Sequence, residues 1–125
     1  MNLTVIRNLI KLKNASLQNQ NQITITFNKY TLELIKILYK NGFIKSYTIL
    51  KQLQISITLN QLYRTSPTST LRIISTPTQK LYITYRDICK IKNIKTLFCF
   101  STTKGLMTID DCKRHHIGGV LLFIC

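Results

Sequence analysis

The stretch Phe100-Ser101-Thr102-Thr103-Lys104-Gly105-Leu106-Met107-Thr108 carries the sharpest structural signal in this 125-residue chain. Its apolar start predicts the end of a buried strand, and the hydroxyl-rich segment Ser101–Gly105 predicts a polar loop. Thr108 stands just before two aspartates, which is the pattern of a helix N-cap followed by an acidic first turn. Farther on, Gly118-Gly119 predicts a turn into a last strand at residues 120–125. Strand, loop, short helix and strand are therefore expected in succession.

The residues before this stretch complete a small β-rich unit. Residues 71–75 and 80–84 predict a strand pair around Pro77, residues 88–91 predict a short helical segment, and residues 97–100 predict a buried strand. Residues 65–70 are small, polar and without periodicity, so they predict a domain boundary. We expect a C-terminal β-rich domain with a short helix over residues 65–125.

The first 64 residues predict an αβαββ domain. Leu3, Ile6 and Ile10 recur at helical spacing and predict a basic helix over residues 3–13, followed by a polar loop at 14–22. Period-two alternation at residues 23–27 predicts a strand. The fold class is therefore α+β, with two small domains at residues 1–64 and 65–125.

A second helix is expected after that strand, between Asn28 as its N-cap and Gly42 as its end. Phe43 and Ile44 would then fold back onto its last turn. Two strands at residues 44–50 and 53–59 would complete the domain. The apolar face of this helix is expected to consist of Leu32, Ile35, Leu38 and Tyr39, and that of the last strand of Leu53, Ile55, Ile57 and Leu59.

Charge is the strongest compositional signal for function. Eighteen Lys and Arg residues face four Asp and Glu residues, giving a formal net charge of +14. The basic residues are dispersed along a chain that is 45% hydrophobic, so they should decorate a folded surface that binds a polyanion. Nucleic acid is the leading candidate, because neutralising phosphates releases counterions. An anionic membrane surface is the alternative. Such binding would be peripheral, because no apolar run approaches the length of a spanning helix.

No enzymatic or metal chemistry is predicted. The four cysteines are widely spaced, which favours small buried hydrophobic residues over a zinc or disulfide framework, and no cofactor is expected. Cys112, His115 and His116 could be combined into a metal site, but adjacent histidines on a helix point about 100° apart. Ser101 and Lys104 match the S-x-x-K spacing of a Ser-Lys hydrolase without its companion motifs. The chain is therefore predicted not to be an enzyme.

Two features favour RNA as the polyanion. The short hydroxyl side chains of the Ser101–Gly105 segment could contact 2′-hydroxyls and base edges in an RNA minor groove. The alternative is an ordinary polar turn. Tyr82, between Lys80 and Arg86, could stack on an unpaired base, or it could be a half-buried strand residue.

The quoted stretch, followed by Gly118-Gly119, closely resembles the C-terminal signature of the small-subunit ribosomal protein number eight family, of bacterial and organellar type. Residues 3–8 look like that family's first helix, and residues 28–44 look like its second. Ser75, Pro77 and Tyr82 also stand at the expected distance before the signature. Two departures are Val120, where the family usually has Glu, and Thr78, where it usually has Gly.

The resemblance implies a two-domain α+β protein that binds a helical element in the central domain of small-subunit rRNA and supports its assembly. Neighbouring small-subunit ribosomal proteins would be its other partners, with no membrane and no small-molecule substrate. Because the chain has drifted from the bacterial pattern and is rich in residues with AT-rich codons, a mitochondrial ribosome is expected. The predicted RNA contacts are Ser101, Thr102, Thr103 and Lys104, supported by Arg7, Lys29, Lys80 and Tyr82.

Overall fold

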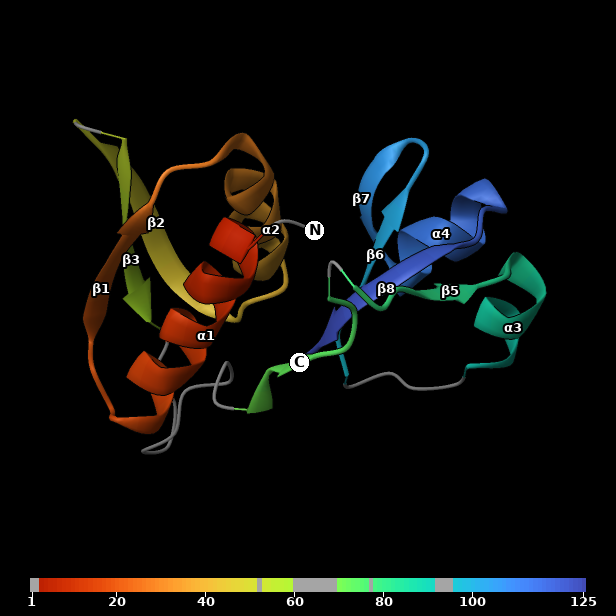
Figure 1. Cartoon of the computed structure of the whole chain (residues 1–125), viewed down its shortest axis with the longest axis horizontal. Coiled ribbons are helices and arrows are strands. Elements are labelled where there is room, and N and C mark those ends of the chain that lie inside the picture. The colour runs from red at the N-terminus through yellow and green to blue at the C-terminus, as the bar shows by residue number, and fades with distance from the viewer. Residues whose placement is uncertain (1–2, 52, 60–69, 77, 92–95) are drawn as a thin grey trace. The chain divides into compact units, whose positions relative to one another are not determined.

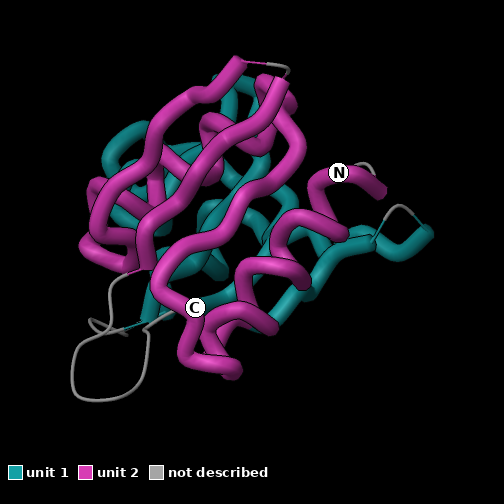
Figure 2. The backbone as a smooth tube through the Cα atoms, turned by 90° about the vertical axis from the view of Figure 1, so that its left-hand side faces the viewer, with its two compact units in different colours: residues 1, 72–125 teal, residues 2–71 magenta. Residues whose placement is uncertain are grey.

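The computed structural model describes residues 3–51, 53–59, 70–76, 78–91 and 96–125 (Figure 1). The chain divides into two compact units, residues 3–71 and residues 72–125, which Figure 2 shows in different colours. Each contains helices and a sheet, so the predicted α+β class is confirmed. The predicted boundary between residues 64 and 65 lies outside the described residues, as do most of the segment 65–70 and Pro77.

In its described residues, the N-terminal unit is a three-stranded antiparallel sheet with two helices. Its sheet has the order β1-β3-β2, so the last strand of the unit lies in the middle. The buried side chains of both helices and of the central strand are mostly aliphatic, which makes this a hydrophobic core between a helical layer and a sheet. The elements are α1 (Leu3–Leu17), β1 (Gln22–Thr26), α2 (Lys29–Lys40), β2 (Ile44–Leu50) and β3 (Gln54–Leu59).

Helix α1 differs from its prediction in both length and face. It continues to Leu17, through residues that were predicted as loop. Its buried face contains Val5, Leu9 and Leu12, whereas the predicted apolar residues Leu3 and Ile10 are exposed. The reason is that two apolar stripes share the helical spacing, and small buried residues at 15 and 16 extend the second one. Asn8 is a buried polar residue of that stripe, and its side-chain nitrogen donates to Thr26 O at 3.1 Å and to Thr31 Oγ1 at 3.3 Å.

Helix α2 begins and ends where the sequence indicated. The Asn28 side chain accepts a hydrogen bond from the Tyr30 backbone N–H at 3.0 Å. At the other end, Gly42 has φ +81°, and the Phe43 N–H donates to the Leu38 carbonyl at 2.9 Å. Two side chains that were predicted to lie in the core lie outside it, because each stands at an end of its element, beyond the part that packs in the core. Tyr39 is exposed, and Leu53 lies before β3 in the hairpin turn, with φ +56°.

The C-terminal unit is a five-stranded antiparallel sheet whose long last strand organises the others. Strand β8 pairs with β6 on one side and with both β4 and β5 on the other. Strand β7 pairs with the free side of β6. The elements are β4 (Arg72–Ile73), β5 (Leu81–Ile83), α3 (Tyr85–Lys90), β6 (Phe98–Thr102), β7 (Gly105–Thr108), α4 (Ile109–His115) and β8 (Gly119–Ile124).

Two local predictions for this unit were wrong. The segments before and after Pro77 do not pair with each other: β4 lies opposite residues 123–124 of β8, and β5 lies opposite residues 119–121. The predicted loop Ser101–Gly105 is a tight hairpin, because Ser101 and Thr102 end β6 and Gly105 begins β7. The first difference arises because both segments pair with the distant β8, which short-range patterns do not reveal. In the second, the polar residues 101 and 102 were assigned to a loop, although they continue β6 and pair with residues 105 and 106.

Helices α3 and α4 cover one face of this sheet. The core beneath them contains Ile88, Phe100, Met107, Ile109, Cys112 and Leu121. Burial and the neighbouring Asp111 carboxylate raise the pKa of the Cys112 thiol to about 11. Cys99 and Cys125 are also buried, as predicted, but Cys89 is exposed on α3. The prediction failed there because this six-residue helix buries only Ile88.

Candidate nucleic-acid interface

Several predicted RNA-contacting residues lie on the sheet face that α3 and α4 do not cover. Tyr82 of β5 is opposite Val120 of β8, which is opposite Ser101 of β6. The neighbours Phe100 and Leu121 belong to the helix-covered core, so alternation turns the row Tyr82–Val120–Ser101 to the other side. We call this side the open face. Residues that are far apart in the sequence thus share one surface.

A small hollow of about 50 Å³ lies on the open face. It brings Lys80 and Ser101 together, beside the apolar side chains of Val120 and Leu122. Ser75 and Thr76 complete its lining, so the hollow offers hydroxyls and one ammonium group but no carboxylate. Val120 contributes an apolar wall at the position where the family that this chain resembles usually has Glu. The hollow therefore suits an anionic or hydroxyl-bearing ligand.

The segment that carries Lys80 is held by side-chain hydrogen bonds. The Ser75 hydroxyl donates to the Leu121 carbonyl of β8 and accepts from the Leu81 N–H at 3.1 Å. The Thr76 N–H donates to the Gln79 carbonyl at 2.8 Å, and the Gln79 N–H donates back to Thr76 Oγ1 at 3.1 Å. Ser75 is itself buried. These bonds fix the chain on both sides of Lys80 relative to β8.

The tip of the β6–β7 hairpin is closed by Thr102. Its hydroxyl donates to the Gly105 carbonyl at 2.8 Å and accepts from the Lys104 N–H at 3.2 Å. Gly105 has φ +107°, a backbone conformation that residues other than glycine rarely adopt. Thr103 and Lys104 are exposed between them. The Thr102 hydroxyl therefore shapes the turn, while the hydroxyl of Thr103 and the ammonium of Lys104 are presented to solvent.

The paired glycines allow the backbone of β8 to approach its neighbours closely. A Cβ atom on Gly119 would lie 2.7 Å from the Ser101 carbonyl oxygen and 2.9 Å from Thr102 Cγ2. A Cβ on Gly118 would lie 2.7 Å from Ile83 O and 2.9 Å from Tyr85 N. Sequence reasoning assigned these glycines only to a turn. In the structure they seat β8 against the hydroxyl-bearing strand and against the end of β5.

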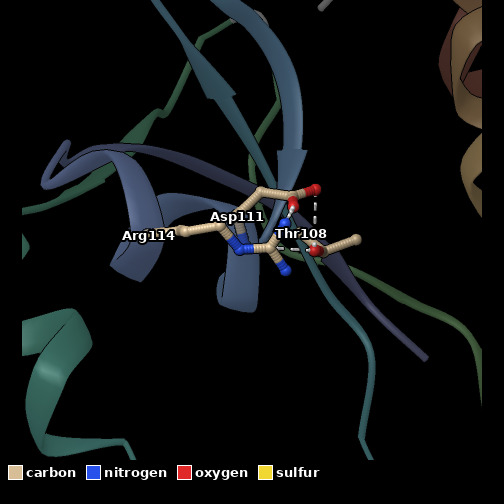
Figure 3. A network of polar contacts seen from close by, with 3 residues as sticks. All are labelled: Thr108, Asp111 and Arg114. Carbon is tan, nitrogen blue, oxygen red and sulfur yellow. Dashed lines mark hydrogen bonds and ion pairs between the residues drawn. The ribbon is translucent and has the colours of Figure 1, made fainter.

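Helix α4 anchors the far end of the hairpin, as Figure 3 shows. The Thr108 hydroxyl accepts from the Asp111 N–H at 3.5 Å and donates to Asp111 Oδ2 at 3.2 Å, a reciprocal cap like a capping box. Arg114 Nη1 lies 3.8 Å from Asp111 Oδ1. Thr84 and Asp87 form the same cap at α3. Both aspartates are thus used at helix starts.

The predicted contacts Arg7 and Lys29 belong to the N-terminal unit. Arg7 is exposed on α1 and lines a groove of about 400 Å³, and Lys29 is exposed at the first position of α2. Sequence reasoning missed this groove because it ended the helix at residue 13. Lys11 lies in it and donates from Nζ to the Thr24 carbonyl at 2.7 Å. The other lining residues are Ile10, Asn14, Ala15, Gln18, Gln20 and Ile23.

The geometry also bears on the other candidate sites. Cys112 lies in the core, whereas His116 Nδ1 is 2.7 Å from the hydroxyl of Tyr85, so these two do not converge on one point. Across the described ranges, no group of three or more His, Cys, Asp or Glu residues is arranged to hold a metal ion.

None of the helices in the described part of the chain is both long enough and apolar enough to cross a bilayer.

Comparison with known proteins identifies the family. The family model for ribosomal protein S8 matches residues 4–125. The small ribosomal subunit protein uS8 of Thermodesulfovibrio yellowstonii is 32% identical over 124 residues, covering 96% of this chain and 90% of that protein. The uS8 of Borrelia turicatae is 30% identical over 118 residues, with coverage of 91% and 89%. A match of this length and identity shows that the chain belongs to the ribosomal protein S8 family.

Proposed function

We propose that the open face binds a helical element of small-subunit rRNA, while basic residues elsewhere on the chain contact phosphates. Membership of the S8 family makes the chain a structural constituent of the small ribosomal subunit and not an enzyme. The observation that carries the proposal is the row Tyr82–Val120–Ser101, with Lys80 beside Ser101 in a hollow without a carboxylate.

The side chains of the open face and of the adjoining β6–β7 tip match the groups that a folded RNA displays. Ser101 and Thr103 carry short hydroxyls, which suit the 2′-hydroxyls and base edges of a wide, shallow minor groove. Tyr82 is 64% exposed, so its ring is available to stack on an unpaired base. Lys80 and Lys104 supply ammonium groups for the phosphates beside them. Thr102 supports this contact indirectly, by closing the turn.

Dispersed charge would supply the remaining affinity. Arg7, Lys11 and Lys29 are exposed basic residues of the N-terminal unit. Each phosphate that such a residue neutralises releases counterions, which strengthens binding at low salt but carries little sequence information. We therefore assign shape recognition to the open face and salt-dependent affinity to the dispersed cations. The proteins bound alongside would be other small-subunit ribosomal proteins.

The compartment follows from the ribosome on which the chain works, either a bacterial cytoplasm or an organelle matrix. We place it in the mitochondrial matrix, because the composition is strongly biased toward Ile, Lys, Asn and Tyr. Mass spectrometry of small subunits purified separately from mitochondria and from other compartments of the source cells would test this. Recovery of the chain only from the mitochondrial fraction is expected, and recovery only from another compartment would refute it.

The binding proposal is tested by titrating the purified chain against the rRNA helix of its own central domain across a salt series. An unrelated hairpin of equal length serves as competitor, and anionic vesicles serve as a second control. We expect tight binding to the rRNA helix that survives the competitor at moderate salt. Equal, steeply salt-dependent affinity for both RNAs would contradict the proposal, and preferential binding to vesicles would favour membrane attachment instead.

A further inference from the structure

The helical layer of the N-terminal unit leaves one end of its sheet uncovered. Ile25 of β1, Ile55 of β3 and Ile49 of β2 form one cross-strand row, so their side chains share a face. Ile25 and Ile55 are 3% and 0% exposed, whereas Ile49 is 58% exposed. In Figure 1 the end of the β2–β3 hairpin extends beyond α1 and α2. The apolar face therefore continues to the Ile49 end of β2, beyond the part of that strand on which α2 packs.

Aromatic side chains border this uncovered end. Tyr39, on the last turn of α2, is 51% exposed and packs edge-on against Tyr47 of β2, with ring centroids 5.6 Å apart. Tyr47 stands opposite the buried Ile57, so it shares the face of Ile49. We call Tyr39, Tyr47 and Ile49 the β2 patch. Large aromatic and aliphatic groups exposed together are a common mark of a protein contact.

The backbone beside the β2 patch is an open sheet edge. Strand β2 occupies the edge of the order β1-β3-β2 and, among the residues the structure describes, pairs with β3 alone. Its outer side presents alternating N–H and C=O groups, which an added strand can satisfy. A row of phosphates fits such an edge poorly, because the outward carbonyl oxygens would face anions.

Charge distinguishes among protein occupants. No acidic residue occurs between Lys40 and Leu59, whereas Lys40, Lys45 and Lys51 each stand within two residues of a member of the β2 patch. A second copy of this chain, with its net charge of +14, would bring like charges together along the whole contact. An extended segment that alternates apolar with acidic residues complements both the patch and its surroundings.

We propose that an extended segment of a neighbouring small-subunit protein, bearing apolar and acidic side chains, adds to the edge of β2 and covers the β2 patch. This inference rests on the proposed function, because the partner belongs to the same particle. The backbone of β2 supplies the hydrogen bonds, Ile49 and the two tyrosines supply the buried surface, and the three lysines select an acidic segment.

The direct test replaces Ile49 with the photo-crosslinking amino acid p-benzoylphenylalanine in the full chain, with Lys36 of α2 replaced in the same way as the control. Incorporation into purified small subunits is measured first, before irradiation. At position 49 we expect an RNase-resistant adduct to another ribosomal protein, mapping to an extended segment rich in Asp and Glu, and no such adduct at position 36. An adduct to RNA, an adduct to a second copy, or no adduct in particles that contain the chain would overturn the docking proposal alone. Absence of the chain from the subunits would refute both proposals.

A charge-reversal pair gives an independent readout. Ile49 is 58% exposed and lies outside the open face. Ile49→Asp and Ile49→Lys should therefore lower the thermal midpoint only slightly, through their lower β-propensity, and keep the affinity for the rRNA helix close to that of the wild type. In assembled subunits washed at moderate salt, we expect Ile49→Asp to reduce retention of the chain several-fold and Ile49→Lys to reduce it less, because only Asp repels an acidic segment. Equal retention of both variants and the wild type would contradict the docking proposal.

Discussion

The two β-hairpins in the described part of the chain have opposite kinds of ends. At the β6–β7 tip the Thr102 hydroxyl bonds both Gly105 O and Lys104 N–H, and a glycine adopts the positive φ. At the β2–β3 end, Leu53 adopts φ +56° and is 70% exposed, a costly conformation for a large side chain. The first hairpin is locally stabilised and presents polar groups, and the second leaves apolar groups uncovered. This contrast agrees with the two proposals, in which the rigid turn belongs to the RNA contact and the uncovered apolar end belongs to the protein contact.

The largest effect is expected from Gly119→Ala, which crowds the close approach of β8 to Ser101 and Thr102 of the first hairpin. The new Cβ would lie 2.7 Å from a backbone carbonyl, which cannot yield as a flexible side chain would. Overpacking of this kind should lower the free energy of unfolding by about 3 kcal/mol and weaken RNA binding with it. Urea denaturation measures the first and RNA titration the second. Wild-type stability would show that the glycine pair does not hold β8 against Ser101.

Gly105→Ala separates backbone conformation from crowding. A Cβ there would meet nothing within 4 Å, so the whole cost comes from φ +107°. We expect a loss of about 1 to 2 kcal/mol in the free energy of unfolding, smaller than for Gly119→Ala. Urea denaturation of the two variants under identical conditions makes the comparison. The reverse order would mean that crowding at Gly119 is relieved by movement of β8.

Thr102→Val removes the hydroxyl that closes the tip while keeping the branched shape of the side chain. The loss of two turn hydrogen bonds should cost about 1 kcal/mol of stability. Affinity for the rRNA helix should fall, while the salt dependence of binding stays close to that of the wild type. Thr48→Val, at an exposed position of β2, is the matched control and should change neither quantity. Identical behaviour of the two variants would remove the special role of Thr102.

The smallest change is expected in the second hairpin, where Leu53→Gly should raise the free energy of unfolding by about 0.5 kcal/mol. Glycine adopts φ +56° without strain, and this gain exceeds its extra cost in chain entropy. Thermal or urea denaturation measures it. A clear loss of stability would show that the exposed Leu53 side chain contributes packing within the N-terminal unit.

Local sequence signals predicted much of this fold. Asn28, Gly42 and Thr108 marked helix ends correctly because capping depends on a few adjacent residues. Strand pairing between segments that lie far apart in the sequence was harder to predict. The segments on either side of Pro77 were expected to pair with each other, but both pair with β8, and nothing in their own composition indicates that partner.

The candidate site was predicted only in part for the same reason. The hydroxyl residues and Tyr82 were selected, yet their arrangement in one row depends on the register of β8. The requirement for Gly119 follows from an interstrand approach that a turn signal does not reveal. The groove beside Arg7 was missed because small residues at 15 and 16 gave little sign that α1 continues.

The central claim is that shape recognition and charge reside in different residues. It is tested most directly by measuring the affinity of Ser101→Ala and Lys29→Ala for the rRNA helix and for an unrelated hairpin across a salt series. We expect Ser101→Ala to lower the preference for the rRNA helix with an unchanged salt slope, and Lys29→Ala to weaken both RNAs equally and flatten the slope by about one unit or less. If both variants changed preference and slope alike, the division between open face and dispersed charge would be wrong.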